Sequence, residues 1–303
     1  MSPARAHRRL ATGVVLSALV TGVVTAVPAV SAGASTPSDH ARPVAAAGLA
    51  PGVPAVAAAA TDTLFTPRLR NVAFQILCSA ENSSLNWRAQ YGYIEYNVEK
   101  NSAENRGYTA GIMGFTSKTH DMYVLVNDYV RAAPTNNPLK PYLPALRRVD
   151  GTSSRKGLGS GFVRAWRAAA KDARFRAAQD RLADTMYFRP AVNRAIADGL
   201  GPLGQFAYFD AMVMHGPGSD KLSFGGIRSA AVKKARTPAA GGGERAYLEA
   251  FLNARVRAMR AEEAHSDVSR VETAQRRWLR AGNLQLRLPL TWWVYGDKYT
   301  IRG

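Results

Sequence analysis

The stretch PRLRNVAFQILCSAEN, residues 67–82, decides the fold of this chain. Its apolar residues recur at positions 69, 72, 73, 76, 77 and 80, which is the spacing of one face of an α-helix. Thr66-Pro67 suits the start of that helix, with threonine as the cap and proline in the first turn. The pattern therefore predicts a helix that packs against the core along one side.

Glu81 continues this apolar stripe at the end of the predicted helix. A carboxyl group in that position is partly removed from water, which raises its pKa. The negative end of the helix dipole acts in the same direction. A carboxyl that keeps its proton near neutral pH is suited to general acid catalysis.

A second acid, Glu104, follows 23 residues later in a polar loop, just before Arg106-Gly107-Tyr108-Thr109. A carboxylate in a polar loop should stay ionised. Two carboxyl groups in such different surroundings are typical of glycoside hydrolysis, in which one acts as acid and the other as base.

The rest of the chain is predicted to be mainly α-helical. We expect helices over 84–96, 119–132, 202–214, 243–264 and 267–281, and one or two helices over 161–199 that bend or break at Pro190. Residues 106–116 alternate around glycines and predict a short strand or hairpin. The 202–214 segment is apolar on nearly every face, so it should be a buried central helix.

Two charged residues fall at positions that should be buried. Asp210 is the only charge in the apolar 202–214 helix, and Arg255 shares a helix face with Tyr247, Phe251 and Met259. A buried charge requires a charged or hydrogen-bonded partner. We therefore expect each of these side chains to be paired.

The N-terminal segment predicts export from the cell. Residues 1–32 have basic residues, then an apolar core, then a small-residue cleavage site, as in a secretory signal peptide. Residues 33–60 are rich in Ala and Pro and should form a linker or pro-segment. This leaves 61–303 as the catalytic domain of a secreted, extracellular protein, with no membrane association after signal cleavage. A membrane anchor is the disfavoured alternative, because small polar residues interrupt the apolar run.

Cysteine content and short motifs exclude several classes of enzyme. Cys78 is the only cysteine, so no intrachain disulfide can form, and its place on the first helix suits a small core residue. The chain has no phosphate-binding loop, no His-Glu-x-x-His and no cysteine cluster. We expect no cofactor and no metal.

The net charge of the chain is +18, and 36 basic and 21 acidic residues lie in 61–303. Such an excess could indicate a binder of anionic polymers, either nucleic acid or a cell-wall polymer. The basic residues are nevertheless spread over several segments, and no RNA-binding signature accompanies them. We expect no nucleic-acid partner and interpret the excess as solvated surface.

Several motifs together resemble the family 46 glycoside hydrolases, the chitosanases, in colinear order over residues 62–303. They are SAENSS (79–84), Trp87, AQY (89–91), RGYT (106–109), Gly111, YLPAL (142–146), GQFAY (204–208), MHGPG (214–218), SFGGIR (223–228), ARTP (235–238), SRV (269–271) and AGNL (281–284). The resemblance implies a lysozyme-like fold with two lobes, a small β segment in the minor lobe and a substrate cleft between the lobes.

The resemblance also implies roles for single residues. Residues matching Asp210, Arg255 and Arg270 form an ion network behind the general acid in that family. Thr109 matches a threonine that helps hold the attacking water. Four further matches are to substrate-binding or supporting positions in the cleft: Arg106, Asp121, His215 and Glu262.

The base has two candidates. The family carries Asp two residues before the Arg-Gly-Tyr-Thr motif, where this chain has Glu104, and the preceding loop is longer than in the family. Glu99 is therefore an alternative base. Ser266 stands where some relatives have a substrate-binding Asp, so that acidic contact is missing here.

The expected function is that of a secreted, monomeric endo-chitosanase. It would hydrolyse β-1,4 links in glucosamine-rich chitosan with inversion, Glu81 acting as acid and Glu104 as base. Two alternatives remain open at this point: a lysozyme-like muramidase, and a non-catalytic basic protein that binds polysaccharide or nucleic acid.

Overall fold

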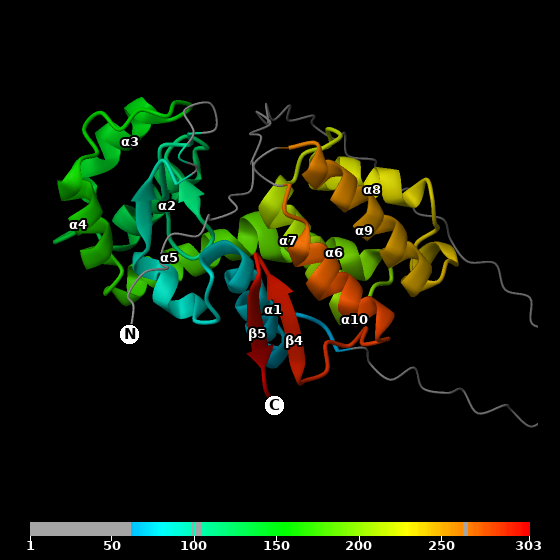
Figure 1. Cartoon of the computed structure of the whole chain (residues 1–303). Coiled ribbons are helices and arrows are strands. Elements are labelled where there is room, and N and C mark those ends of the chain that lie inside the picture. The colour runs from blue at the N-terminus through cyan, green and yellow to red at the C-terminus, as the bar shows by residue number, and fades with distance from the viewer. Residues whose placement is uncertain (1–61, 99, 101–104, 263–265) are drawn as a thin grey trace, which may run out of the picture. The chain divides into compact units, whose positions relative to one another are not determined.

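A computed structural model describes residues 62–98, 100, 105–262 and 266–303 (Figure 1). The first helix, α1 (Pro67–Asn82), lies where the apolar stripe predicts it and buries that stripe. Thr66 occupies the cap position, but its hydroxyl donates to the carbonyl of Thr63 and not to the helix. The helix ends at Ser83, whose backbone is left-handed with φ of 50°.

The predicted helix over 84–96 is wrong. The segment forms a short 3-10 helix, η1 (Trp87–Gly92), followed by strand β1 (Ile94–Tyr96). The side chain of Asn86 caps the 3-10 turn by accepting from the amide of Ala89. Ile94 is β-branched and Tyr96 is aromatic, and residues of both kinds favour a strand once a partner strand is available.

The hairpin predicted over 106–116 supplies that partner. Strands β2 (Tyr108–Ala110) and β3 (Phe115–Thr116) pair antiparallel, and β1 adds to the other edge of β2. Helices pack around this small sheet, and the first group of elements is completed by α2 (Asp121–Ala132), η2 (Lys140–Tyr142), α3 (Leu143–Val149) and α4 (Ser160–Ala169).

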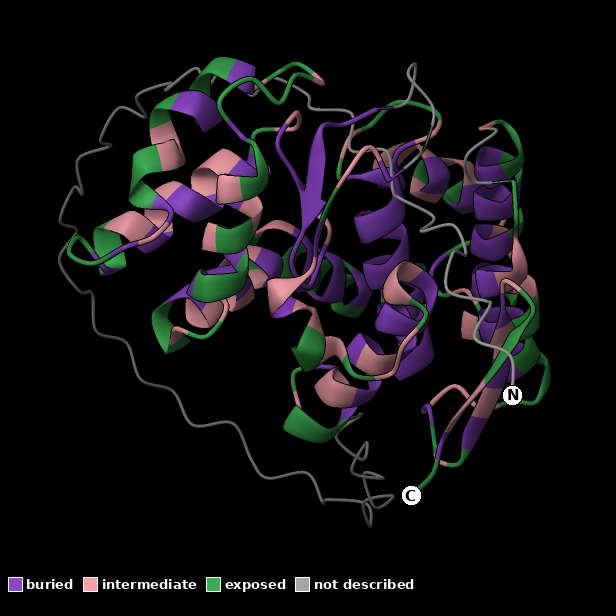
Figure 2. Ribbon diagram, turned by 60° about the vertical axis from the view of Figure 1, so that its left-hand side comes forward, coloured by how far each residue is buried: buried purple, intermediate pink, exposed green. Residues whose placement is uncertain are grey.

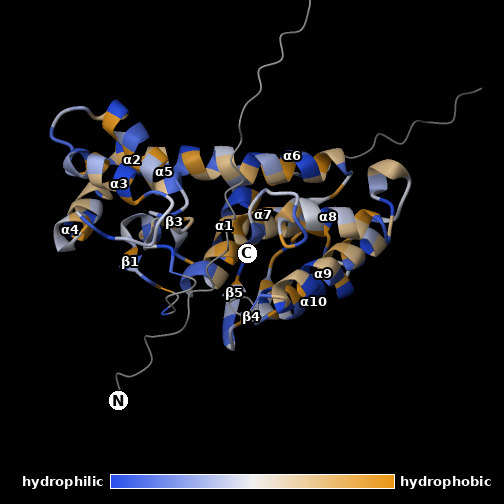
Figure 3. Ribbon diagram, turned by 90° about the horizontal axis from the view of Figure 1, so that it is seen from above, coloured by the Kyte–Doolittle hydropathy of each residue, from blue (hydrophilic) through white to orange (hydrophobic). Residues whose placement is uncertain are grey.

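A long helical run follows in which three segments continue one another, as Figure 3 shows: α5 (Ala173–Ala183), the π-helical turn η3 (Asp184–Phe188) and α6 (Arg189–Ala197). The break expected at Pro190 therefore takes the form of a π turn just before it. Pro190 has no amide hydrogen and its ring would clash with the preceding turn, and the wider π turn accommodates the ring. A second break separates α4 from α5, where Asp172 caps α5.

The second group of elements surrounds α7 (Pro202–His215), whose residues are all buried, as predicted (Figure 2). The helices of this group are α8 (Phe224–Val232), η4 (Pro238–Ala240), α9 (Glu244–Arg260), the π-helical η6 (Arg270–Gln275) and α10 (Arg276–Arg280). The α7 helix contacts α1, α6, α8 and α9. These two groups match the two lobes that were expected.

A C-terminal hairpin was not predicted. Strands β4 (Leu290–Val294) and β5 (Asp297–Ile301) pair antiparallel, and β4 packs on η6. Trp292 is buried, and its indole nitrogen donates to the hydroxyl of Ser79 on α1 at 3.0 Å. The end of the chain is thereby joined to the helix that carries Glu81.

The signal peptide expected over 1–32 and the linker expected over 33–60 lie outside the described residues. Within the described part of the chain, no helix combines the length and the apolar character needed to cross a membrane.

Candidate active site

Glu81 lies in the last turn of α1 with its side chain 11% exposed. Its Oε1 accepts a hydrogen bond from Nη2 of Arg270 at 2.8 Å. Removal from water favours the neutral acid, whereas the arginine favours the carboxylate. The two effects on the charge of Glu81 oppose each other, which the apolar stripe alone could not indicate.

Arg270 connects Glu81 to a buried ion network. The same Nη2 atom also donates to Oδ1 of Asp210, and Nη1 of Arg255 donates to Oδ2 of Asp210. The side chains of the two arginines and the aspartate are at most 2% exposed. The pairing expected for Asp210 and Arg255 is therefore present, and Arg270 joins them.

The network holds its charges firmly. Burial alone would raise the pKa of Asp210, but the neighbouring Arg255 and Arg270 hold it well below the usual range. Burial lowers the pKa of Arg255, whereas Asp210 and Glu81 outweigh burial at Arg270 and raise its pKa. Asp210 is thus ionised at any working pH, and it keeps Arg270 directed at Glu81.

Gln275 is a member of this network that sequence reasoning missed. Its amide nitrogen donates to Oδ2 of Asp210 at 2.7 Å, and its amide oxygen accepts from Arg255 at 3.3 Å. Gln275 and Arg270 lie at the two ends of η6, and the π geometry directs both toward Asp210. Gln275 is a polar residue of the predicted 267–281 helix, five positions after Arg270, and the local sequence gives no sign of this role.

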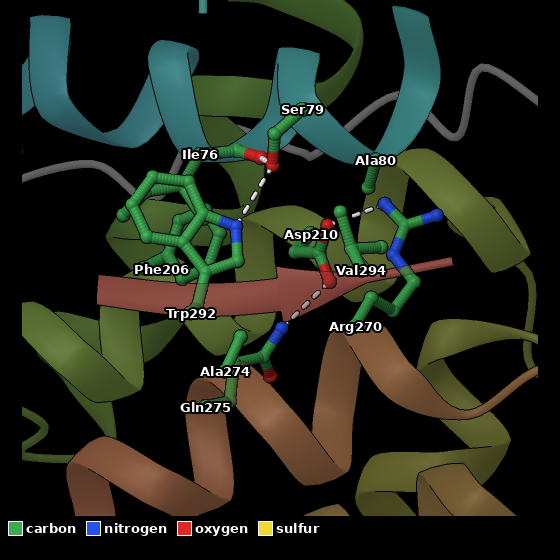
Figure 4. Close-up of a pocket in the computed structure, with 10 residues that line it drawn as sticks. All are labelled: Ile76, Ser79, Ala80, Phe206, Asp210, Arg270, Ala274, Gln275, Trp292 and Val294. Atoms are coloured by element: carbon green, nitrogen blue, oxygen red, sulfur yellow. Dashed lines mark hydrogen bonds and ion pairs between the residues drawn. The ribbon is translucent and has the colours of Figure 1, made fainter. Parts of the chain in front are cut away.

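A small cavity of about 10 Å³ lies beside Asp210 and Arg270, as Figure 4 shows. Asp210, Arg270 and Gln275 line it together with apolar side chains from α1, α7 and β4. Such a volume has room for about one water molecule and none for a sugar. The cavity therefore lies at the edge of the ion network and is too small to bind a substrate.

Thr109 and Arg106 lie at the small sheet of the other group. Thr109 is the central residue of β2, is buried, and its hydroxyl has no hydrogen-bond partner among the described residues. An unengaged hydroxyl of this kind suits the expected role of holding a water molecule. Arg106, also buried, precedes β2, and its carbonyl accepts from the amide of Lys118.

Asp121 begins α2 and is buried more deeply than a helix-start residue usually is. Its Oδ1 accepts three hydrogen bonds, each at 2.9 Å, from the amides of Thr116 and Met122 and from the hydroxyl of Thr119. Burial raises the pKa of Asp121 to about 7, although these bonds and the charge of Arg106 lower it. The anchoring of Oδ1 fixes the orientation of the carboxyl group.

The other π turn among the described residues, η3, carries a tyrosine that interacts electrostatically with Asp121. Tyr187, in η3, is buried, and both burial and the charge of Asp121 raise the pKa of its phenol. Both of these π turns thus carry a polar side chain that interacts with a residue of the candidate site: Tyr187 electrostatically with Asp121, and Arg270 through a hydrogen bond with Glu81.

His215 and Glu262 lie close to each other. His215 is the last residue of α7 with a fully buried side chain, and its Nδ1 is 3.8 Å from Oε2 of Glu262. Glu262 is 15% exposed and follows the end of α9. Ser266, where some relatives have Asp, is exposed. Glu262 therefore provides a carboxylate close to His215, whereas Ser266 provides none.

The two candidates for the base, Glu104 and Glu99, lie outside the described residues. Cys78, by contrast, is buried in α1, and burial raises the pKa of its thiol to about 12. A thiol that keeps its proton is not a nucleophile. Among the described residues, no cluster of three or more His, Cys, Asp or Glu side chains could hold a metal ion.

A partly buried carboxyl group at a helix end, held by a buried ion network in a mainly helical fold, would suit a general acid. The class of protein that this fold and site indicate is a glycoside hydrolase. The chain matches the model of glycosyl hydrolase family 46 over residues 75–290, and it belongs to that family.

Individual relatives agree with this assignment. The chain is 55% identical over 237 residues to a chitosanase of Streptomyces sp. (strain N174), covering 78% of this chain and 83% of the relative. It is 54% identical to a chitosanase of Nocardioides sp. (strain N106), covering 86% and 93%. The co-crystal structure of chitosanase OU01 with substrate matches with a TM-score of 0.76 at 52% identity, covering 80% of this chain and all of that chain. The expected lysozyme-like fold is therefore confirmed.

Proposed function

We propose that this protein is an endo-chitosanase that hydrolyses β-1,4 links in glucosamine-rich chitosan with inversion at the anomeric carbon. The relatives described above, chitosanases at 54–55% identity and a chitosanase solved with substrate, support the substrate class. The observation that carries the proposal is the contact between Glu81 and the buried Arg270–Asp210 pair.

Glu81 is the general acid of the proposed reaction. Arg270 fixes its carboxyl group through Oε1, and the proton is delivered from Oε2 to the glycosidic oxygen as the bond from that oxygen to C1 breaks. Because Arg270 also favours the ionised form, the enzyme should lose activity as the pH rises and Glu81 loses its proton.

The base completes the reaction from the opposite face of the sugar ring. Glu104 takes a proton from a water molecule held by Thr109, and the water oxygen bonds to C1 with inversion. Glu99 is the alternative, since the loop is longer than in the family. Inversion requires the two carboxyl groups to lie roughly 6.5–9.5 Å apart, whereas retention requires about 5–5.5 Å.

A polycationic substrate must approach a basic protein. Salt screens repulsion between exposed charges beyond about 8–10 Å, so carboxylates close to the substrate can still attract its amines. Asp121 and Glu262 supply such carboxylates in the proposal, with Arg106 and His215 as supporting residues. The proposed protein acts outside the cell as a monomer, after removal of residues 1–32.

A reducing-sugar assay run in parallel on chitosan, chitin and peptidoglycan tests the substrate class. We expect chitosan to be hydrolysed fastest. Hydrolysis of peptidoglycan without hydrolysis of chitosan would favour the muramidase alternative, and no hydrolysis of any polymer would favour the non-catalytic binder. Proton NMR during early hydrolysis tests the stereochemistry: the α-anomer should appear first, and an initial β-anomer would exclude inversion.

A further inference from the structure

The turn of the C-terminal hairpin has an unusual residue. Tyr295 and Gly296 connect β4 to β5, with Val294 paired to Asp297, and their φ angles are 52° and 84°. Two-residue turns with positive φ at both positions favour Asn-Gly or Asp-Gly. A bulky tyrosine in the left-handed region is conformationally costly and persists only where its surroundings hold it. Backbone strain of this kind is often found at functional sites.

The tip of the hairpin is fixed to the segment that carries Arg270. The amide of Tyr295 donates to the hydroxyl of Ser269 at 2.9 Å, one residue before Arg270. The hydroxyl of Thr273, in η6, donates to the carbonyl of Trp293. Val294, the residue before the turn, lines the cavity with Arg270 and Asp210 (Figure 4). The backbone of the turn is therefore attached beside the ion network.

The side chain of Tyr295 lies within the electrostatic field of the same network. Burial raises the pKa of its phenol, the charge of Arg270 lowers it, and the charges of Glu81, Asp210 and Asp267 raise it further. Arg255, the other arginine of the network, also interacts electrostatically with Tyr295. The phenol consequently stays neutral at any working pH and is able to donate a hydrogen bond.

We infer that Tyr295 is a positioning residue for the general acid. The strained turn fixes Tyr295 beside Ser269, the residue before Arg270, and in this role the tyrosine ring limits the freedom of the Glu81 carboxyl group and its access to water. The inference rests on the proposed role of Glu81 as the acid. It explains why a position that favours asparagine or glycine holds a large aromatic residue: the backbone strain is retained because the side chain is needed there.

Replacement by a residue that tolerates the turn separates positioning from stability. Asparagine adopts positive φ readily, which offsets part of the packing lost with the ring, so the Tyr295→Asn chain should still fold. We expect kcat on chitosan to fall about 10-fold or more with KM within about two-fold, as when a catalytic group is misplaced. The high-pH limb of the kcat profile should also move, because the surroundings of Glu81 change.

Tyr295→Phe tests the hydroxyl separately from the ring, and Tyr299→Phe in β5 is the matched control. Tyr299 belongs to the same hairpin and stacks on Trp292, away from the turn. We expect Tyr295→Phe to lower kcat and to shift the pH profile, each by less than Tyr295→Asn does. Tyr299→Phe should leave kcat and the pH profile unchanged.

Glu81→Gln, assayed in parallel, distinguishes the two possible failures. If Glu81→Gln is inactive while Tyr295→Asn keeps a normal kcat and pH profile, the positioning role is overturned and the proposed function stands. If Glu81→Gln keeps its activity, both fall. Should Tyr295→Asn fail to fold, a Tyr295→Phe variant with normal kcat and pH profile would overturn the inference equally.

Discussion

Replacement of Asp210 by asparagine is the most direct test of the ion network behind Glu81. The substitution keeps the size of the side chain and removes its charge. Arg255 then has no carboxylate partner among the described residues, and Arg270 retains only Glu81. The positive charges of two buried guanidinium groups would then repel each other without the negative charge of Asp210 between them.

The expected cost follows from the burial of the three side chains. Breaking a buried ion pair by removing one partner costs about 3–5 kcal/mol. For a domain of this length, each kcal/mol corresponds to a shift in melting temperature of about 2–4 °C. Asp210→Asn should therefore lower the melting temperature by about 6–20 °C at neutral pH. Activity should fall as well, because Asp210 no longer fixes the position of Arg270 and Arg270 then orients Glu81 less well.

The effect should also depend on pH, with a definite sign. Burial would raise the pKa of Asp210, but Arg255 and Arg270 hold it below its usual value in the folded state. The unfolded value is about 3.9, so the stabilisation by the ionised group is fully present above about pH 5. It is lost as the pH falls toward the folded pKa. The difference in stability between wild type and Asp210→Asn should thus be equal at pH 6 and 8 and shrink below about pH 4.

Calorimetric melts of the wild type, Asp210→Asn and Asp128→Asn give the comparison. Asp128 also accepts from two arginines, Arg131 and Arg181, but its side chain is 31% exposed. An exposed pair contributes about 0–1 kcal/mol, so this control should melt close to the wild type. If Asp210→Asn lowers the melting temperature no more than Asp128→Asn, the assignment of stability to the buried network is wrong.

Four further predictions concern the proposed catalytic and substrate-binding residues. Glu81→Gln should keep the fold and chitosan binding but lower the hydrolysis rate about 10²–10⁴-fold, and a rate above roughly a tenth of wild type would remove Glu81 from the mechanism. Asp121→Asn should raise KM more than it lowers kcat, and a clear gain in chitosan affinity would contradict this. Because burial raises the pKa of Asp121 to about 7, the wild type should lose stability as the pH rises from about 4 through 7, and melts of the Asn variant should lack this loss. Glu104→Gln should lose nearly all activity and Glu99→Gln little; the reverse result in the same assay would assign the base to Glu99.

Sequence reasoning predicted those parts of the site that leave a local pattern. The apolar stripe located α1 and the position of Glu81 at its end. The 202–214 segment is apolar on nearly every face, which identified Asp210 as its only charge, and helical spacing identified Arg255 as facing the core. In each case the helical period of the apolar residues identifies the buried face of the helix. The prediction therefore did not depend on knowing which residues pack against that face.

Contacts between distant segments left no such pattern. Arg270 reaches Glu81 across 189 residues, and only the family resemblance pointed to it. The C-terminal hairpin alternates buried and half-buried residues over 290–294, but five residues followed by a tyrosine in the turn do not meet the usual hairpin signal. The segment 84–96 became a 3-10 turn and a strand because β2 was available as a partner, which is a tertiary effect on local preference.

The π-helical segment η6 requires a fixed number of residues between Arg270 and Gln275. A π turn contains one residue more than the α turn that it replaces, so deleting any one residue of 270–275 would restore α spacing. Everything on one side of the deletion would then rotate by about 100° relative to the other. Either Arg270 would turn away from Asp210, or Trp278 would leave its edge-on contact with Trp292. This segment should therefore accept many substitutions at its exposed positions and no change in the number of its residues.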